Sequence, residues 1–219
     1  FGKLVNISGS RRMSGACAMS TLAALRSGVG LCTVATSKSV VDSLSSSIYE
    51  TMYIPLKETP KGEISSTNGK EILTACEKAT AVIIGCGLGV SEDTTKLVEF
   101  LLENITCPII LDADGINCIA PCIDIIKNTR ASIIVTPHPA EMARLLSITT
   151  AEVLKDRLSC AIKLSTELGI TVVAKGAPTI IAGESGFCYL NTTGNAGLSR
   201  GGSGDVLTGI ICGFLAGGL

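Results

Sequence analysis

Short apolar runs rich in β-branched residues alternate with amphipathic stretches along most of this chain, and this order limits the folds open to it. The short runs predict buried strands at residues 4–7, 31–36, 81–84, 109–111, 133–136 and 171–174. Apolar residues spaced by three and four predict helices at residues 16–26, 94–103, 140–146 and 151–168. The alternation predicts an α/β fold with a mostly parallel central sheet.

Two later runs, at residues 179–182 and 187–190, flank the segment Gly-Glu-Ser-Gly at 183–186. A glycine-bounded loop between two strand-like runs is typical of a β-hairpin. We therefore expect the sheet to be mixed at one edge.

Composition excludes two classes of partner. The 219 residues include 18 basic and 19 acidic side chains, so the net charge is -1 and the chain lacks the basic excess that nucleic-acid binding requires. The longest apolar run, residues 206–219, contains four glycines and is shorter than the ~18 residues of a membrane span. We expect a globular protein that binds neither nucleic acid nor a membrane.

The chain length suits one domain with a large core. The sequence begins at Phe1, next to a strand-like run, and stops at Leu219 inside a helical pattern. We expect residues 1–219 to form a single domain that is truncated at both ends.

Ten cysteines lie inside apolar runs, no two of them form a CxxC pair, and His138 is the only histidine. This pattern lacks the ligand set of a zinc site, and we assign no residue to a metal. Reduced, buried thiols indicate a cytoplasmic protein.

A glycine-rich segment precedes the last predicted helix, at 206–215. Gly201, Gly202 and Gly204 carry no side chains that would keep an anion from the backbone, and glycine permits positive φ angles. The first N–H groups of a helix have no intrahelical partners, so they bind anions well. We predict a phosphate site at Gly202, Ser203 and Gly204.

Asp205 follows this loop in the first turn of the same helix. The helix dipole there favours an ionised carboxylate, which can accept a proton from a hydroxyl group. The alternative is an ordinary capped helix after a flexible loop, with Asp205 as a stabilising first-turn acid.

Ligands of parallel α/β sheets bind beyond the carboxyl ends of the strands. After the run at 81–84, Gly87 and Gly89 lie in a loop that lets a ligand approach the backbone. A dinucleotide-binding fingerprint requires a third glycine where this chain has Val90, so the loop is equally typical of a tight strand-to-helix turn.

Asp112, Asp114 and Asn117 follow the next run. They could hold Mg²⁺ through water or bind a ribose, or they could form an Asx turn and a helix cap. His138 lies between two prolines on a stiff turn, where it could bind a polar substrate or serve the structure alone. Lys175 and Gly176 follow a buried strand and could bind a nucleotide, unless Lys175 is a surface lysine at a turn.

Together these segments resemble the ADP- or ATP-dependent NAD(P)H-hydrate dehydratase family of the ribokinase-like superfamily. The resemblance covers nearly the whole chain. Its motifs are Gly15-Ala16 with the helix leading to GVGL at 28–31, GCGLG at 85–89, DADGIN at 112–117, TPHPAEMARLL at 136–146, KGAPT at 175–179 and NAGLSRGGSGDVLTG at 195–209. The GGSGD element occurs across ribokinase-like kinases, whereas TPHP with its glutamate, combined with DADGIN, is more particular to the dehydratases.

The resemblance implies a three-layer ribokinase-like sandwich that repairs hydrated NADH or NADPH at the expense of ADP or ATP, with Mg²⁺ as a cofactor. Asp205 would act as the base on the ring hydroxyl. The implied substrate-binding residues are Ala16, Gly87, Gly89, Asp112, Asn117 and His138, together with Asp205. The implied nucleotide-binding residues are Lys175, Gly176, Ala177, Pro178 and Thr179, with Gly202, Ser203 and Gly204. The family also implies a homo-oligomer.

The chain departs from the family pattern at Ala140, where glycine is usual, at Ala196, where proline is usual, and at Ser199-Arg200. None of these changes removes a proposed catalytic group. Two other functions remain open: a ribokinase-like kinase for a small alcohol, and a nucleotide-binding module without turnover. The residues do not distinguish ADP from ATP or the NADH hydrate from the NADPH hydrate.

Overall fold

The computed structural model describes residues 2–219, and its strands form one sheet in the order β3-β2-β1-β4-β5-β6-β7-β8-β9. The strands are β1 Lys3–Ile7, β2 Leu31–Ser37, β3 Met52–Leu56, β4 Ala81–Ile84, β5 Ile109–Leu111, β6 Ile133–Val135, β7 Thr171–Ala174, β8 Thr179–Ala182 and β9 Cys188–Asn191. Neighbours from β3 to β7 pair in parallel, whereas β8 is antiparallel to both β7 and β9. The mostly parallel sheet with a mixed edge is therefore confirmed.

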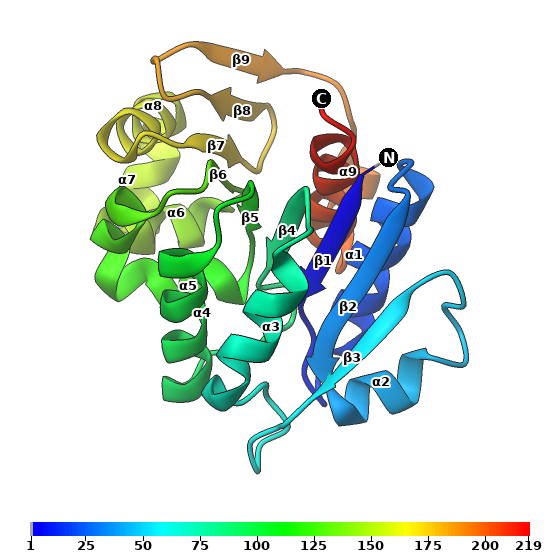
Figure 1. The fold of residues 1–219 in the computed structure, drawn as a ribbon. Coiled ribbons are helices and arrows are strands. Elements are labelled where there is room, and N and C mark those ends of the chain that lie inside the picture. The colour runs from blue at the N-terminus through cyan, green and yellow to red at the C-terminus, as the bar shows by residue number, and fades with distance from the viewer. Residues whose placement is uncertain (1) are drawn as a thin grey trace.

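Helices cover both faces of the sheet (Figure 1). They are α1 Ser14–Arg26, α2 Lys38–Leu44, α3 Gly69–Cys76, α4 Glu92–Asn104, α5 Asp114–Ile119, α6 Pro139–Leu146, α7 Thr150–Lys155, α8 Arg157–Leu168 and α9 Ser203–Ala216, with short 3-10 helices at Ser66–Asn68, Ala120–Asn128 and Ala196–Leu198. Among residues 2–219, none of these helices has both the length and the apolar composition required to cross a bilayer.

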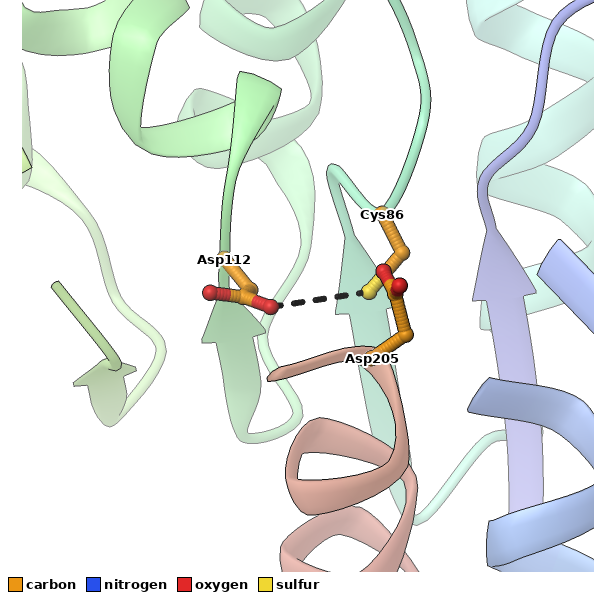
Figure 2. A group of neighbouring side chains, drawn as sticks. All are labelled: Cys86, Asp112 and Asp205. Atoms are coloured by element: carbon orange, nitrogen blue, oxygen red, sulfur yellow. Dashed lines mark hydrogen bonds between the residues drawn. The ribbon is translucent and has the colours of Figure 1, made fainter. Parts of the chain in front are cut away.

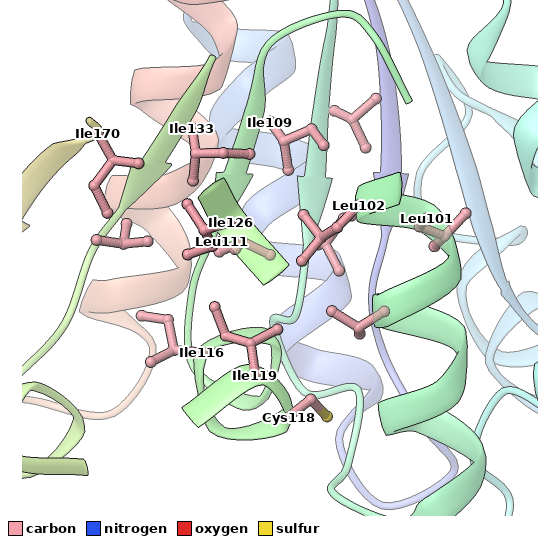
Figure 3. Close-up of a cluster of buried hydrophobic side chains, with 14 of the residues drawn as sticks. Leu101, Leu102, Ile109, Leu111, Ile116, Cys118, Ile119, Ile126, Ile133 and Ile170 are labelled. Carbon is pink, nitrogen blue, oxygen red and sulfur yellow. The ribbon is translucent and has the colours of Figure 1, made fainter. Parts of the chain in front are cut away.

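Alternation along the strands builds two cores. Val82 and Ile84 of β4 join the larger cluster, to which the apolar faces of α3 to α8 contribute. Figure 3 shows part of this cluster, with labelled residues of α4, β5, α5 and β6. Ala81 and Ile83 of the same strand point to the opposite face and join a smaller cluster with α1, α2 and α9. Successive side chains of a strand point to opposite faces, so a strand buried on both sides is apolar throughout. The result is a three-layer sandwich.

Several features depart from the expected elements, among them helices α2, α3 and α5, which the sequence analysis did not predict. The helix expected at 151–168 is two helices, because Asp156 has φ -150° and ψ 77° and its side chain accepts a hydrogen bond from the Ser159 N–H to cap α8. Strand β3 was not expected, because Pro55 lies inside it and only Leu56 is buried. It is the outermost strand of the sheet, where a missing N–H donor is tolerated.

Helix α9 packs directly on α1 through two glycines. A Cβ at Gly209 would overlap the Ser20 carbonyl oxygen, and one at Gly213 would lie 2.7 Å from the Ser27 Cβ. The close approach fixes the N-terminal end of α9 at the edge of the sheet where the parallel strands end. The loops that follow β4, β5, β6 and β7, in which the sequence placed candidate site residues, begin at this same edge.

Candidate active site

The buried carboxylate of Asp112 organises the edge. It follows β5 and is 1% exposed. Its Oδ1 accepts hydrogen bonds from Lys175 Nζ and from Thr136 Oγ1, both at 2.7 Å, and its Oδ2 accepts one from Thr208 Oγ1 at 2.9 Å. Burial alone would raise the pKa of Asp112, but the Lys175 ammonium and these hydrogen bonds hold it below its usual value. Asp112 is therefore a fixed negative charge.

Lys175 is not the surface lysine that the sequence left open. Its side chain is 20% exposed, and its Nζ lies 2.7 Å from Asp112 Oδ1 and 3.6 Å from Glu141 Oε2. Burial lowers the pKa of Lys175, yet the two carboxylates outweigh burial and leave the pKa above its usual value. The ammonium group therefore points into the acidic cluster.

Asp205 lies beside this pair. As expected, it occupies the first turn of α9. Its carboxylate, the Asp112 carboxylate and the Cys86 Sγ lie within 4.8 Å of one another, and the thiol donates to Asp112 Oδ2 at 3.8 Å (Figure 2). The expectation that the helix dipole favours the ionised form is incomplete, because burial and the charge of Asp112 raise the pKa of Asp205. A raised pKa makes this carboxylate a stronger base.

The glycine loop at 201–204 requires a positive φ angle at fewer positions than predicted. Only Gly202 has positive φ, at 90°, whereas Gly201 and Gly204 do not. Gly204 instead provides space, because a Cβ there would lie 3.4 Å from Lys175 Nζ. Gly202 is the N-cap of α9 and has no side chain to cap the helix, while the Ser203 N–H already donates to the Arg200 carbonyl. Of the N–H groups predicted to bind phosphate, that of Ser203 therefore already has a partner within the protein.

The loop after β4 is a tight turn that adjoins α1. Gly87 has φ 64°, and a Cβ there would lie 2.8 Å from the Cβ of Ala16, so these two proposed substrate residues are neighbours. Gly89 donates its N–H to Asp114 Oδ2 at 2.8 Å. Glycine at these positions serves the protein's own packing, because a Cβ at Gly87 would also lie 2.8 Å from the Met13 Cβ and one at Gly89 would meet the Glu63 side chain.

His138 and Asn117 are both engaged with α6. His138 Nδ1 accepts hydrogen bonds from the N–H groups of Ala140 at 3.1 Å and Glu141 at 3.3 Å, and its Nε2 lies 3.2 Å from Glu141 Oε1. Burial, with Lys175 and Arg144 nearby, lowers the pKa of His138. Asn117 Oδ1 accepts from Arg144 at 2.8 Å. The histidine thus caps the helix, which is the structural role left open above.

If His138 caps α6, substitutions that remove or keep a side-chain acceptor at this position should differ in their effect on stability. His138→Ala removes the acceptor for two backbone N–H groups, and we expect unfolding free energy to fall by about 1 kcal/mol in urea titrations. His138→Asn keeps a side-chain acceptor at the cap and is expected to restore most of that loss. Equal stability of the two variants would contradict the capping role.

Sequence reasoning noted Glu141 only as part of a family motif and assigned it no role, and it missed Arg157. Glu141 is 3% exposed, and burial raises its pKa although Lys175 opposes the shift. Its position three residues after His138, typical of a capping box, was the available signal. Arg157 donates to the carbonyls of Ala174, Lys175 and Pro178 and so holds the loop at 175–179, which contains Gly176, Ala177 and Thr179. No sequence pattern indicated that contact.

The Cys86, Asp112 and Asp205 group resembles a metal cluster only in its spacing. Burial and Asp112 raise the pKa of the Cys86 thiol well above its ordinary value, and a thiol must lose its proton to bind a metal. Both Asp112 oxygens already accept hydrogen bonds. Hydrogen bonding therefore accounts for the close spacing of Cys86 and Asp112.

A family model described as NAD(P)H-hydrate dehydratase matches residues 4–219. The chain belongs to this family. It is 35% identical over 222 residues to an ADP-dependent (S)-NAD(P)H-hydrate dehydratase of Neisseria meningitidis, covering 100% of this chain and 71% of that protein. It is 38% identical over 219 residues to a bifunctional NAD(P)H-hydrate repair enzyme of Moorella thermoacetica, covering 100% of this chain and 41% of that protein.

A solved relative confirms the fold expected of the NAD(P)H-hydrate dehydratase family. The crystal structure of the ADP/ATP-dependent NAD(P)H-hydrate dehydratase of Bacillus subtilis, co-crystallised with ATP and Mg²⁺ and soaked with CoA, superposes with a TM-score of 0.81 at 32% identity. The match covers 99% of this chain and 74% of that one. The chain spans about two fifths of the length of bifunctional members: its match to the Moorella enzyme covers 41% of that protein.

Proposed function

We propose that this protein restores NADH or NADPH from the hydrated forms, using ADP or ATP. The observation that supports this most strongly is Asp205. Its carboxylate is fixed at the N-terminus of α9, beside the Lys175–Asp112 pair and within 4.8 Å of Cys86 and Asp112. A base at a helix end that favours anions is suited to remove a proton from a hydroxyl while a phosphoryl group arrives.

In the first step, Asp205 accepts the proton of the hydroxyl on the nicotinamide ring, and the hydroxyl oxygen attacks the terminal phosphoryl group of the nucleotide. The bond from that phosphorus to the bridging oxygen of the nucleotide breaks, which leaves AMP from ADP or ADP from ATP. The N-terminal end of α9 at Gly202, Ser203 and Gly204 faces the charge that develops on the phosphoryl oxygens.

In the second step, the carbon–oxygen bond breaks. Hydroxide is a poor leaving group, whereas phosphate departs with the bonding electrons. The lone pair of the ring nitrogen assists, and a neighbouring ring carbon loses a proton to restore the double bond. The products are reduced nicotinamide and inorganic phosphate.

The two ligands are assigned to opposite sides of Asp205. Ala16, Gly87 and Gly89 are assigned to the substrate side next to α1, and the family resemblance assigns Asp112, Asn117 and His138 to the same ligand. The loop from Lys175 through Gly176, Ala177 and Pro178 to Thr179, held by Arg157, lines the nucleotide side with Gly204. These assignments place both ligands along one edge, as direct transfer requires.

Mg²⁺ is assigned to the nucleotide phosphates because the hydrogen bonds of Asp112 leave it no free oxygen for a metal. When bound there, it supplies positive charge to the phosphoryl oxygens. We also propose a cytoplasmic homo-oligomer, which the family resemblance implies, and a small-molecule substrate with no nucleic-acid or membrane partner.

The experiment mixes the protein with hydrated NADH or NADPH and Mg²⁺, adds ADP or ATP, and follows the absorbance of reduced nicotinamide and the release of phosphate. We expect both products in equal amounts, and only when hydrate and nucleotide are both present. Accumulation of a phosphorylated alcohol would identify a small-molecule kinase. Tight nucleotide binding with no product from any hydrate would identify a silent binding module.

A further inference from the structure

The site brings together more carboxylate groups than cationic groups. Asp112 is 1% exposed and Glu141 is 3% exposed, and both contact the same ammonium group, Lys175 Nζ, at 2.7 Å and 3.6 Å. Asp205 is a third carboxylate close to Asp112. Buried carboxylates that close cannot all stay ionised without a compensating cation.

We propose that Lys175 is a positioning residue: its ammonium group neutralises Asp112 and Glu141, and thereby leaves Asp205 able to accept the proton of the substrate hydroxyl. The inference rests on the proposed function and goes beyond it. It assigns the Lys175 side chain to the proton-transfer apparatus, while the backbone that follows Lys175 serves the nucleotide.

The contacts favour this role over a phosphate contact. If Lys175 Nζ moved from Asp112 to a phosphate, Asp112 would keep, among the described residues, only neutral hydrogen-bond donors: the hydroxyls of Thr136 and Thr208 and the Cys86 thiol. Burial of an unpaired carboxylate is costly, so the pair resists that movement. Gly204 lies next to this pair, because a Cβ there would contact Lys175 Nζ at 3.4 Å and Asp112 Oδ2 at 3.8 Å.

The charged and titratable groups around Asp205 come from several elements, including the Cys17 thiol on α1. Asp112 follows β5, Lys175 follows β7, Asp114 begins α5, and the neutral Cys86 thiol follows β4. Without Lys175, Asp112 and Asp205 become two coupled carboxylates that hold one proton between them. The form of Asp205 that accepts a proton then predominates only at higher pH.

The test compares Lys175→Met, Asp112→Asn and the double variant, with Lys163→Met as a matched control. Lys163 is an exposed lysine 4.0 Å from Glu167 on α8. We measure the pH dependence of kcat/KM for the hydrate. Lys175→Met is expected to move the acid limb to higher pH by about one pH unit, and Asp112→Asn to move it to lower pH. The double variant is expected to have a pH profile close to that of the wild type. The control Lys163→Met is expected to have the wild-type profile.

A second readout does not depend on turnover. Carbon-13 NMR of aspartate-labelled protein without ligands follows the Asp205 carboxyl directly, with the signal assigned from its loss in Asp205→Asn. The titration of the Asp205 carboxyl is expected to move to higher pH in Lys175→Met and to lower pH in Asp112→Asn, even if the hydrate proves not to be the substrate. Because the two single variants shift in opposite directions, either one that folds tests the proposal.

Two results would overturn the inference. One is an Asp205 titration that stays unchanged in Lys175→Met or in Asp112→Asn. The other is a Lys175→Met enzyme whose KM for nucleotide rises at least about tenfold with an unchanged pH profile, which is the pattern of a phosphate-binding lysine.

Discussion

Asp205→Asn is expected to lower turnover of the hydrate by about a thousandfold or more while nucleotide affinity stays within about tenfold of wild type. The asparagine amide has nearly the same shape as the carboxylate but cannot accept the proton of the hydroxyl. The proposed nucleotide contacts are the loop after β7 and the N–H groups of Gly202, Ser203 and Gly204, and the substitution changes none of them, so we expect nucleotide affinity to depend little on this charge. Single-turnover kinetics and calorimetric titration of ADP and ATP measure the two quantities separately.

A matched control is Asp42→Asn, which removes an exposed carboxylate paired with Lys38 on α2. It is expected to leave both rate and affinity unchanged. Loss of nucleotide affinity together with rate in Asp205→Asn would assign Asp205 a structural role, the alternative that its first-turn position also permits.

Gly209→Ala is expected to destabilise the protein by about 2 to 3 kcal/mol, although alanine is the better helix former. The new Cβ would overlap the Ser20 carbonyl oxygen and lie 2.7 Å from the Ala23 Cβ, so α9 must move away from α1. That displacement also moves Asp205, one turn earlier on α9. Chemical unfolding in urea and the hydrate turnover rate should therefore both change.

Gly15→Ala on α1 is the matched control, because a Cβ there meets nothing within 4 Å. Substitution of a helical glycine in open space is expected to raise stability by about 0.5 to 1 kcal/mol. If both variants proved equally stable, the close α1–α9 contact would not exist in solution.

Apolar pattern was sufficient to predict most of the sheet. Strands buried on both faces, such as β4 and β5, are continuous apolar runs and were located to the residue. The edge strand β3 was missed because a strand exposed on one side has no such run, and its pairing with β2 depends on contacts distant in sequence. The break at Asp156 depends on a local cap inside an otherwise helical pattern.

The parts of the site that depend on one continuous segment of sequence could be predicted. Asp205 and the glycines belong to one continuous segment with a local physical meaning, and Asp112 follows a strand whose position was clear. The Lys175–Asp112 ion pair joins residues 63 positions apart, and only the order of β5, β6 and β7 brings them together. The capping role of His138 was left open because a ring between two prolines gives no information about the direction of its nitrogens.

The central claim is that the ring hydroxyl itself receives the phosphoryl group. Hydrated NADH labelled with a heavy oxygen isotope in that hydroxyl tests the claim directly, when it is turned over with ADP or ATP and the phosphate is analysed by mass spectrometry. Phosphorylation followed by carbon–oxygen cleavage predicts one labelled oxygen in each molecule of inorganic phosphate. Label released entirely into water, with unlabelled phosphate, would contradict it.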